Sequence, residues 1–315
     1  MKIALVGNQN SGKTTLFNLL TGSNQKIGNW PGVTIEYKRG LIRGTDHEII
    51  DLPGIYSLSP YSVEEQISRT FLFEENVDLI LNVIDSTSIE RSLYLTTQLL
   101  ELDIPMIVAL NMTDLLEQRG IKIDLGTFED YLDTTILPIS ATKKTNIFNL
   151  IQAIKKNDYR KNHYKHFYDH QMERAASLIE SQIDHPHKRF ITMKLIENDA
   201  SYDRFVTPLI IETITDLKKA YHRDLEQVIV DERYRYIEYL RDASIDQKKL
   251  KMTLTDKIDR VLLNRYLAIP IFMVIMFAIY YLAAGPVGGF TVDLVSNLMG
   301  SFSSWTYDTL IGLNA

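Results

Sequence analysis

The first half of the chain alternates short apolar runs with longer amphipathic stretches. The apolar runs, which predict strands, lie at residues 3–6, 35–42, 48–51, 79–84, 106–110 and 136–139. The intervening patterns predict helices at residues 13–20, from a capping box at 62–65, at 90–102 and at 147–154. Strands that alternate with helices form a mostly parallel sheet covered by helices. We therefore expect an α/β domain over residues 1–158.

The second half has a different pattern of apolar and polar residues. Strand-like runs disappear after about residue 157, and charged, tyrosine-rich stretches follow at 164–183, 202–222 and 225–241. These stretches favour helices, so we expect a small all-α domain over residues 159–262.

An uncharged run, LAIPIFMVIMFAIYYLAA, occupies residues 267–284 and ends before Gly285 and Pro286. Its length is close to the roughly 20 residues with which a helix crosses a bilayer. A buried core helix is the alternative, which an apolar surface on every side disfavours. We expect a transmembrane helix over residues 263–286.

The charges around this run predict its orientation. Lysine and arginine residues precede it at positions 248, 249, 251, 257, 260 and 265, and none follows it. The positive-inside rule therefore places the preceding domains in the cytoplasm. Residues 287–315 are apolar with interspersed Asp293 and Asp308, which favours an amphipathic membrane-associated segment. The chain has no obvious ending, so we expect it to be the front part of a longer, multi-pass membrane protein.

Composition narrows the classes of function. The 315 residues carry a net charge of -6, so we expect no nucleic-acid partner, whose binding would need a basic stripe. The absence of cysteine excludes disulfides and thiolate metal sites. The N-terminus opens directly into a strand pattern rather than a secretory signal.

A glycine-rich sequence, GNQNSGKT at residues 7–14, joins the first predicted strand to the first predicted helix. This context is that of a P-loop: backbone N–H groups approach phosphates, Lys13 contacts the β and γ oxygens, and Thr14 offers its hydroxyl to Mg²⁺. The predicted nucleotide-binding residues of the loop are Gly7, Asn8, Gln9, Asn10, Ser11, Gly12, Lys13, Thr14 and Thr15.

Two further segments are predicted to face the γ-phosphate. Asp51, Leu52, Pro53 and Gly54 end a strand, where the carboxylate can hold Mg²⁺ and the Gly54 amide can contact the phosphate. The glycine- and proline-rich segment 28–34, GNWPGVT, is predicted to be a loop that closes over the nucleotide. Its predicted contacts are Gly32, Val33 and Thr34, with Thr34 as a second hydroxyl ligand of Mg²⁺.

The sequence Asn111-Met112-Thr113-Asp114 follows the strand at 106–110. The Asp114 carboxylate can accept the N1–H and 2-amino hydrogens of guanine, which adenine lacks, and rejection of the wrong base can reach about 10⁴. Met112 stands where this motif usually has lysine. Backbone N–H groups after the strand at 136–139 are predicted to meet guanine O6, in the segment Ser140, Ala141 and Thr142. We therefore expect a Ras-like P-loop GTPase.

The means of hydrolysis differs from that of Ras-like enzymes. Ile55 follows Gly54, where those enzymes have a water-orienting glutamine. We interpret Arg39, Arg43 and Arg69 as solvent-facing rather than as arginine fingers. The Asn10 side chain can either hold a monovalent cation beside the phosphates or bond its own loop, and its sequence context leaves both open. The candidate catalytic residues are Asn10, Lys13, Thr34 and Gly54.

These motifs together resemble the N-terminal part of the FeoB family of bacterial ferrous iron transporters, over the whole chain. The motifs that carry the resemblance are GN-x-NSGKT, GNWPGVT, DLPG followed by IYSL, and NM-x-D. The resemblance implies a slow GTPase, a helical domain that damps nucleotide release, and a membrane domain that conducts Fe²⁺. It also implies potassium activation through Asn10 and the carbonyls of Gly28 and Trp30. Gln9 departs from the family, which usually has proline there.

We thus expect the GTP-binding and GTP-hydrolysing cytoplasmic module of a ferrous iron transporter in a bacterial cell membrane. The expected partners are guanine nucleotide, Mg²⁺, K⁺, the bilayer, Fe²⁺ as cargo, further copies of the chain and small accessory proteins. One alternative is a membrane-anchored regulatory GTPase that transports nothing. Another is an RNA-associated GTPase, for which the basic appendage is missing.

Overall fold

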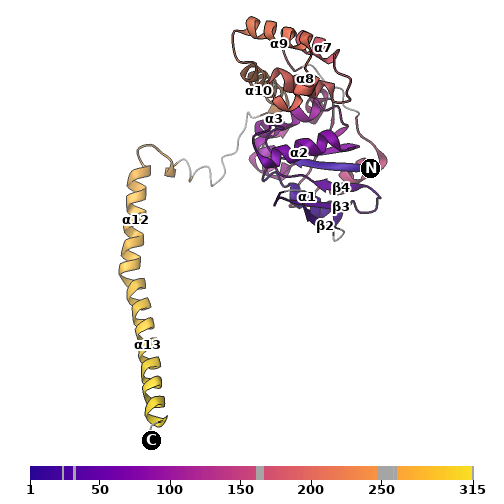
Figure 1. Cartoon of the computed structure of the whole chain (residues 1–315). Coiled ribbons are helices and arrows are strands. Elements are labelled where there is room, and N and C mark those ends of the chain that lie inside the picture. The colour runs from indigo at the N-terminus through magenta and orange to yellow at the C-terminus, as the bar shows by residue number, and fades with distance from the viewer. Residues whose placement is uncertain (23–24, 31–32, 161–166, 247–257, 259–260, 314–315) are drawn as a thin grey trace. The chain divides into compact units, whose positions relative to one another are not determined.

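The computed structural model describes residues 1–22, 25–30, 33–160, 167–246, 258 and 261–313 (Figure 1). It divides into two units, Met1–Leu250 and Lys251–Ala315, which are described separately.

The first unit contains a seven-stranded sheet in the order β2-β3-β4-β1-β5-β6-β8. Five neighbouring strands run parallel: β4 (Glu48–Asp51), β1 (Lys2–Gly7), β5 (Leu79–Asp85), β6 (Met106–Asn111) and β8 (Thr135–Pro138). The strands β3 (Glu36–Leu41) and β2 (Gln25–Asn29) extend the sheet in antiparallel fashion. The predicted mostly parallel sheet is confirmed.

Helices cover both faces of this sheet. The helices are α1 (Lys13–Thr21), α2 (Val63–Glu74), α3 (Ile89–Leu100), α4 (Thr113–Arg119), α5 (Leu125–Leu132) and α6 (Ile147–Lys156). Neighbouring residues of a strand point to opposite faces. Ile3 and Leu5 accordingly pack in one core cluster with α1 and α6, whereas Ala4 and Val6 pack in the other with α2, α3 and α5.

The hairpin of β2 and β3 corrects part of the sequence interpretation. Gly28 and Asn29 lie in β2, opposite Tyr37 and Glu36 of β3, so the prediction of a loop is wrong for these two residues. The sequence QKIGN of β2 is polar and has no period-2 pattern. Pairing with β3, rather than burial of an apolar face, makes it a strand.

The helical part consists of α7 (His170–Glu180), α8 (Lys188–Ile196), the 3₁₀ helix η2 (Ala200–Phe205), α9 (Pro208–Tyr221) and α10 (Leu225–Ser244). The predicted helices at 202–222 and 225–241 are found, with a break before α9 at its N-cap Thr207. Residues 164–166 of the predicted helix at 164–183 lie outside the described residues. Sequence reasoning missed α8.

The helical part shares a core with the sheet. Met172, Ile191 and Ile237 belong to the same buried cluster as Val6 and Leu99. After α10, β9 (Ile245–Asp246) pairs with β7 (Lys122–Ile123), so the chain returns to the α/β part before the second unit begins. This short pair is the one departure, among the described residues, from an all-α composition.

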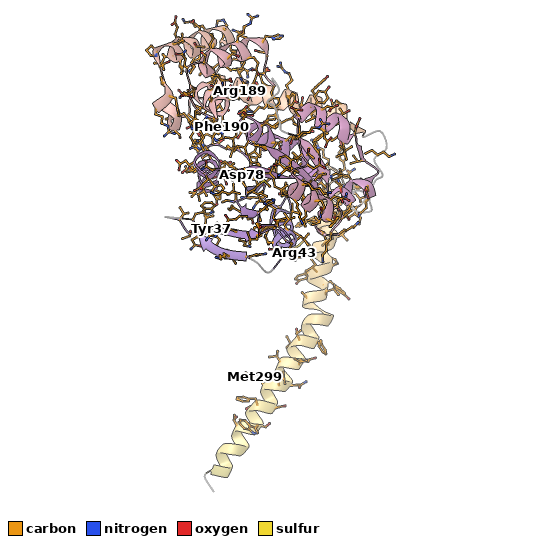
Figure 2. The ribbon with its side chains drawn as sticks, turned by 90° about the vertical axis from the view of Figure 1, so that its right-hand side faces the viewer. Tyr37, Arg43, Asp78, Arg189, Phe190 and Met299 are labelled. Atoms are coloured by element: carbon orange, nitrogen blue, oxygen red, sulfur yellow. The ribbon has the colours of Figure 1, made fainter. Side chains whose placement is uncertain are left out.

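The second unit contains α12 (Ala268–Ala284) and α13 (Pro286–Leu313), separated at Gly285. The stretch Ala268–Thr306 is long and apolar enough to cross a membrane, and an 18-residue window within it has a mean hydropathy of 2.1. Met299 projects from α13 and is 65% exposed (Figure 2). The predicted break before Pro286 is present, and membrane association of residues 287–315 stays a prediction.

Candidate nucleotide site

A cavity of about 540 Å³ opens where β1 and β6 end. Ligands of α/β proteins bind at the carboxyl ends of parallel strands, in pockets of about 300–1,000 Å³. The cavity is lined by Asn8, Gln9, Asn10, Gly12, Lys13, Thr14, Thr15, Gly54, Asn111, Met112, Ala141 and Thr142. These residues come from the phosphate loop, from Gly54 of the predicted magnesium motif and from the segments predicted to read guanine.

The phosphate loop depends on glycine at two close approaches. A Cβ on Gly7 would lie 2.6 Å from the carbonyl oxygen of Val83. Gly12 has a left-handed φ of 87°, and a Cβ there would lie 2.2 Å from Asn111 Nδ2. The loop therefore passes close to its neighbours and delivers the chain into the N-terminus of α1, whose dipole favours an anion.

Lys13 begins α1 and is buried against the end of β4. Its ammonium donates hydrogen bonds to the Asp51 carboxylate and to the carbonyl of Leu52. Asp51 and Leu52 are themselves buried. The lysine of the predicted phosphate loop is thus in contact with the carboxylate of the predicted magnesium motif.

Two polar atoms of the loop lack a described partner. Asn8 Oδ1 and Ser11 Oγ are buried and have no hydrogen bond within the described part of the chain. An unsatisfied buried polar atom costs about 1–3 kcal/mol. A polar ligand at the loop fits this arrangement.

Asn111 connects the phosphate loop to the other end of the cavity. Its Nδ2 donates to the Ser11 carbonyl at 2.8 Å, and its Oδ1 accepts from the Ala141 amide at 2.9 Å. Met112 has a left-handed φ of 63° and precedes α4. The turn places Asp114 in the first turn of that helix.

Asp114 is mostly buried but does not itself line the cavity. Its Oδ2 lies 3.2 Å from Lys143 Nζ. Burial acts to raise the pKa of Asp114, but hydrogen bonds from Ser140 and Lys143 outweigh it, so this pKa lies below its usual value. The carboxylate is therefore ionised at neutral pH and able to accept two hydrogen bonds.

Residues 1–154 match the family model of ferrous iron transport protein B, and residues 168–246 match that of the FeoB cytosolic helical domain. A GDP-bound mutant of the FeoB G-domain from S. thermophilus is 38% identical, with a TM-score of 0.74, 78% of this chain covered and 100% of that one. The chain belongs to the FeoB family.

Other FeoB proteins give the same result. The Fe(2+) transporter FeoB of Escherichia coli K12 is 36% identical over 302 residues, which are 92% of this chain and 39% of that protein. The chain thus spans about two fifths of the length of the curated relatives. A structure of S. thermophilus NFeoB bound to GDP·AlF4⁻ and K⁺ is 40% identical, with a TM-score of 0.68 and coverage of 76% of this chain and 98% of that one.

Several residues of the FeoB motifs lie outside the cavity in this structure. Thr34 is exposed, and neither Val33 nor Gly28 lines the cavity. The Trp30 ring packs edge-on against the Phe71 ring of α2, with 5.5 Å between the ring centroids. The backbone carbonyl of Trp30 accepts a hydrogen bond from the Val33 amide. Of the predicted potassium ligands, only Asn10 lines the cavity.

The remaining predicted contacts have mixed outcomes. Leu52 is buried in the core, Ser140 is buried, and neither these two nor Pro53 lines the cavity. Gly32 lies outside the described residues. Within the described part, the structure therefore joins the phosphate loop, Gly54 and the guanine motifs but not segment 28–34.

Gln9 and Ile55 have clear positions. A Cβ on Gly54 would lie 2.9 Å from Gln9 Cγ, so Gln9 packs against the glycine predicted to contact the γ-phosphate. The Ile55 side chain is buried, and its amide donates to the Gly7 carbonyl at 3.2 Å. Ile55 is thus a core residue that anchors this segment to β1.

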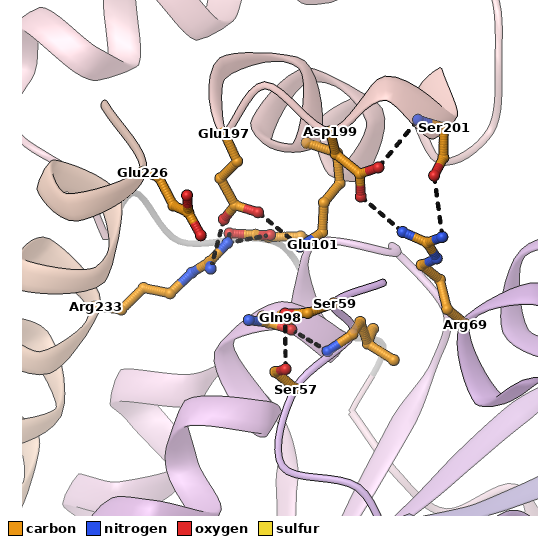
Figure 3. Close-up of polar contacts among 12 residues, drawn as sticks. Ser57, Ser59, Arg69, Gln98, Glu101, Glu197, Asp199, Ser201, Glu226 and Arg233 are labelled. Atoms are coloured by element: carbon orange, nitrogen blue, oxygen red, sulfur yellow. Dashed lines mark hydrogen bonds and ion pairs between the residues drawn. The ribbon is translucent and has the colours of Figure 1, made fainter. Parts of the chain in front are cut away.

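The interpretation of Arg69 as solvent-facing is wrong. Arg39 and Arg43 are exposed as predicted, but Arg69 of α2 is buried. Its Nη1 lies 2.7 Å from an Asp199 carboxylate oxygen, and its Nη2 donates to Ser201 Oγ at 3.2 Å (Figure 3). The partner is 130 residues away in the chain, so no local pattern could have revealed it.

A second buried network joins α3 to the helical part. Arg233 of α10 and Glu101 are both fully buried, and Arg233 Nη2 lies 3.0 Å from Glu101 Oε2. Arg233 Nη1 also donates to Glu197 at 2.8 Å (Figure 3). Its Nε donates to the Tyr168 hydroxyl at 2.9 Å. Glu197 additionally pairs with Lys194 at 2.7 Å.

The segment that follows Gly54 contacts α3 and α10. The Leu58 amide donates to Gln98 Oε1 of α3 at 2.5 Å, and the Tyr61 hydroxyl donates to Glu226 of α10 at 2.8 Å. This segment is therefore joined to the helical part by a direct hydrogen bond from Tyr61 to α10.

Proposed function

We propose that the chain is the GTP-binding and GTP-hydrolysing cytoplasmic part of a ferrous iron transporter. The observation that carries this proposal is the single cavity in which Asn111 ties the phosphate loop to the guanine-reading segment. The relatives support the two halves of the proposal: S. thermophilus FeoB proteins bind GDP, and the E. coli protein is named as an Fe(2+) transporter.

The roles of the residues follow from their chemistry. Lys13 and the N-terminus of α1 would contact the phosphates, while Asp114 would accept two hydrogen bonds from guanine. Thr14, Thr34 and Asp51 are the proposed ligands of Mg²⁺, which would neutralise charge on the phosphate oxygens. Thr34 is exposed and outside the cavity, so its role requires a movement of the segment at 33–34.

The proposed catalytic group beside the phosphates is Asn10. It lines the cavity, and its carbonyl oxygen suits a monovalent cation such as the K⁺ bound by the S. thermophilus protein. Gly28 and Trp30 lie in and next to the β2–β3 hairpin, so their share in that site requires the hairpin to rearrange. GTP hydrolysis should be slow and several-fold faster in potassium than in sodium. The Asn10→Ala variant should lose this difference, whereas Asn149→Ala, at an exposed position on α6, should keep it. Equal rates of the wild type in the two salts would refute the cation site.

Base recognition provides the decisive test of the function. Asp114→Asn should weaken GDP binding by at least about 100-fold and improve binding of xanthosine diphosphate, because the amide donates where the carboxylate accepted. Glu117→Gln removes an exposed carboxylate from the same helix and should change neither affinity. Binding would be measured by titration calorimetry. Wild-type protein that binds adenine and guanine nucleotides equally would refute the proposal.

Iron transport is proposed for the longer protein of which this chain resembles the front part. The soluble unit would lie in the cytoplasm, since the lysine and arginine residues flank α12 on that side alone. Uptake of radioactive Fe²⁺ by cells that express the natural protein should be lost with Lys13→Ala. Uptake that persists in this variant would separate transport from nucleotide binding.

A further inference from the structure

The cation nearest the guanine-reading carboxylate in the structure is Lys143. Its ammonium lies 3.2 Å from Asp114 Oδ2, and the Lys143 side chain is 54% exposed whereas that of Asp114 is 16% exposed. The loop that carries the lysine is held in place. The Lys143 amide donates to Ser140 Oγ at 3.2 Å, and Ser140 and Thr145 pair through their backbones.

This contact occupies an atom that guanine would need. Guanine presents two donors, N1–H and the 2-amino group, to the two oxygens of the carboxylate, and one of these oxygens is engaged by Lys143. Met112, Ala141 and Thr142 line the cavity beside it, but Asp114 does not. The Lys143 ammonium is therefore paired with the Asp114 carboxylate at the edge of the cavity.

The position also explains how Asp114 tolerates the loss of its ligand. Without a nucleotide, the Asp114 carboxylate keeps a hydrogen bond from Ser140, and Lys143 supplies a second donor. Met112, at the position where the motif usually has lysine, cannot donate. Lys143, on a partly exposed and rotatable stem, can.

We propose that Lys143 competes with guanine for Asp114 and so lowers the affinity for guanine nucleotides while softening their distinction from inosine nucleotides. This inference rests on the proposed function. Hypoxanthine, the base of inosine, has N1–H but no 2-amino group, so it fills one carboxylate oxygen and leaves the other to Lys143. Guanine donates to both oxygens and so competes with the lysine for Oδ2.

The test compares GDP and inosine diphosphate on wild-type protein and on Lys143→Met. The variant should bind GDP about fivefold more tightly and release it more slowly, which corresponds to about 1 kcal/mol, the upper end for a partly exposed ion pair. Inosine diphosphate should gain little, because its free carboxylate oxygen loses Lys143. The ratio of the two dissociation constants should therefore rise about threefold to fivefold.

Two further variants separate the contact from its alternatives. Lys144→Met removes the same charge from the neighbouring exposed position and should leave both affinities at their wild-type values. Lys143→Arg keeps a cation and should retain the wild-type ratio. Equal changes for the two nucleotides, or the same result with Lys144→Met, would overturn the inference in favour of a structural or general electrostatic effect.

The direction of the change in GDP affinity also tests the inference. Weaker GDP binding by Lys143→Met would mean that the lysine assists guanine, and the competition would be refuted. If the wild-type protein binds GDP but the ratio is unchanged in Lys143→Met, this inference alone fails. If the wild-type protein binds no GDP, both the proposed function and this inference are refuted.

Discussion

Replacement of Arg233 by methionine should be among the most destabilising changes in the first unit, Met1–Leu250. Methionine keeps most of the length and the apolar stem of arginine but removes its charge. In the structure the guanidinium donates to both oxygens of Glu101, at 3.1 and 3.0 Å, and to Glu197 at 2.8 Å. Arg233 and Glu101 are fully buried.

The expected loss follows from what the variant leaves behind. Glu197 retains its pair with Lys194, so its charge stays compensated. Of the contacts described for Glu101, the hydrogen bond from the Tyr168 hydroxyl at 2.6 Å remains, and the carboxylate lies without a cation in the core. Removal of one partner of a buried ion pair costs about 3–5 kcal/mol. For a unit of this size this corresponds to a Tm roughly 6–20 °C lower.

Thermal unfolding followed by circular dichroism would measure this loss. The control is Arg235→Met on the same helix, where the side chain is 65% exposed and its pair with Glu232 should contribute about 1 kcal/mol or less. The double variant Glu101→Met with Arg233→Met should recover most of the stability, because an apolar pair needs no compensating charge. A Tm of Arg233→Met within about 3 °C of the wild type would refute the reasoning, and so would a double variant no more stable than the single one.

The other predictions concern the loop, the connection to the helical part, and acid. Gly12→Ala should weaken GDP binding at least about tenfold, because its Cβ would displace the Asn111 amide, whereas Gly44→Ala, at a φ of 71° in open space, should cost only about 1 kcal/mol of stability. Arg69→Met, which breaks a buried contact of α2 with the helical part, should change the GDP dissociation rate in stopped flow; an unchanged rate would show that this contact does not transmit to the site. Burial raises the pKa of Glu197, but Lys194 and Arg233 outweigh it, so this pKa lies below its usual 4.5. The carboxylate therefore stabilises the fold above about pH 4.5 and this contribution is lost as the pH falls further, so the Tm of Glu197→Gln should drop less than that of the wild type between about pH 5 and pH 3.

Local patterns determined much of the sheet and the phosphate loop. Ile3 and Leu5 alternate with Ala4 and Val6 because both faces of a central parallel strand are covered, and such a strand reads as a continuous apolar run. The capping box is equally local, since Ser62 Oγ accepts from the Glu65 amide three residues later. A glycine with positive φ between a strand and a helix is encoded in the same short stretch.

Other elements had no local signal. The β2 strand exists because β3 pairs with it, and α8 is buried almost throughout, so its sequence carries no amphipathic period. Segment 28–34 was predicted to lie over the nucleotide from its motif alone. In the structure Trp30 of this segment packs instead against Phe71 of α2.

The sequence by itself thus determined that a P-loop, a magnesium-type carboxylate and a guanine motif follow one another, because each depends on residues within one strand-to-helix turn. Only the tertiary structure decided which charges meet. Arg69 and Arg43 look alike in the sequence, yet one is buried against Asp199 and the other is exposed. The pairing of a charge is set by elements that are distant in the chain and close in space, and burial then multiplies its energetic weight.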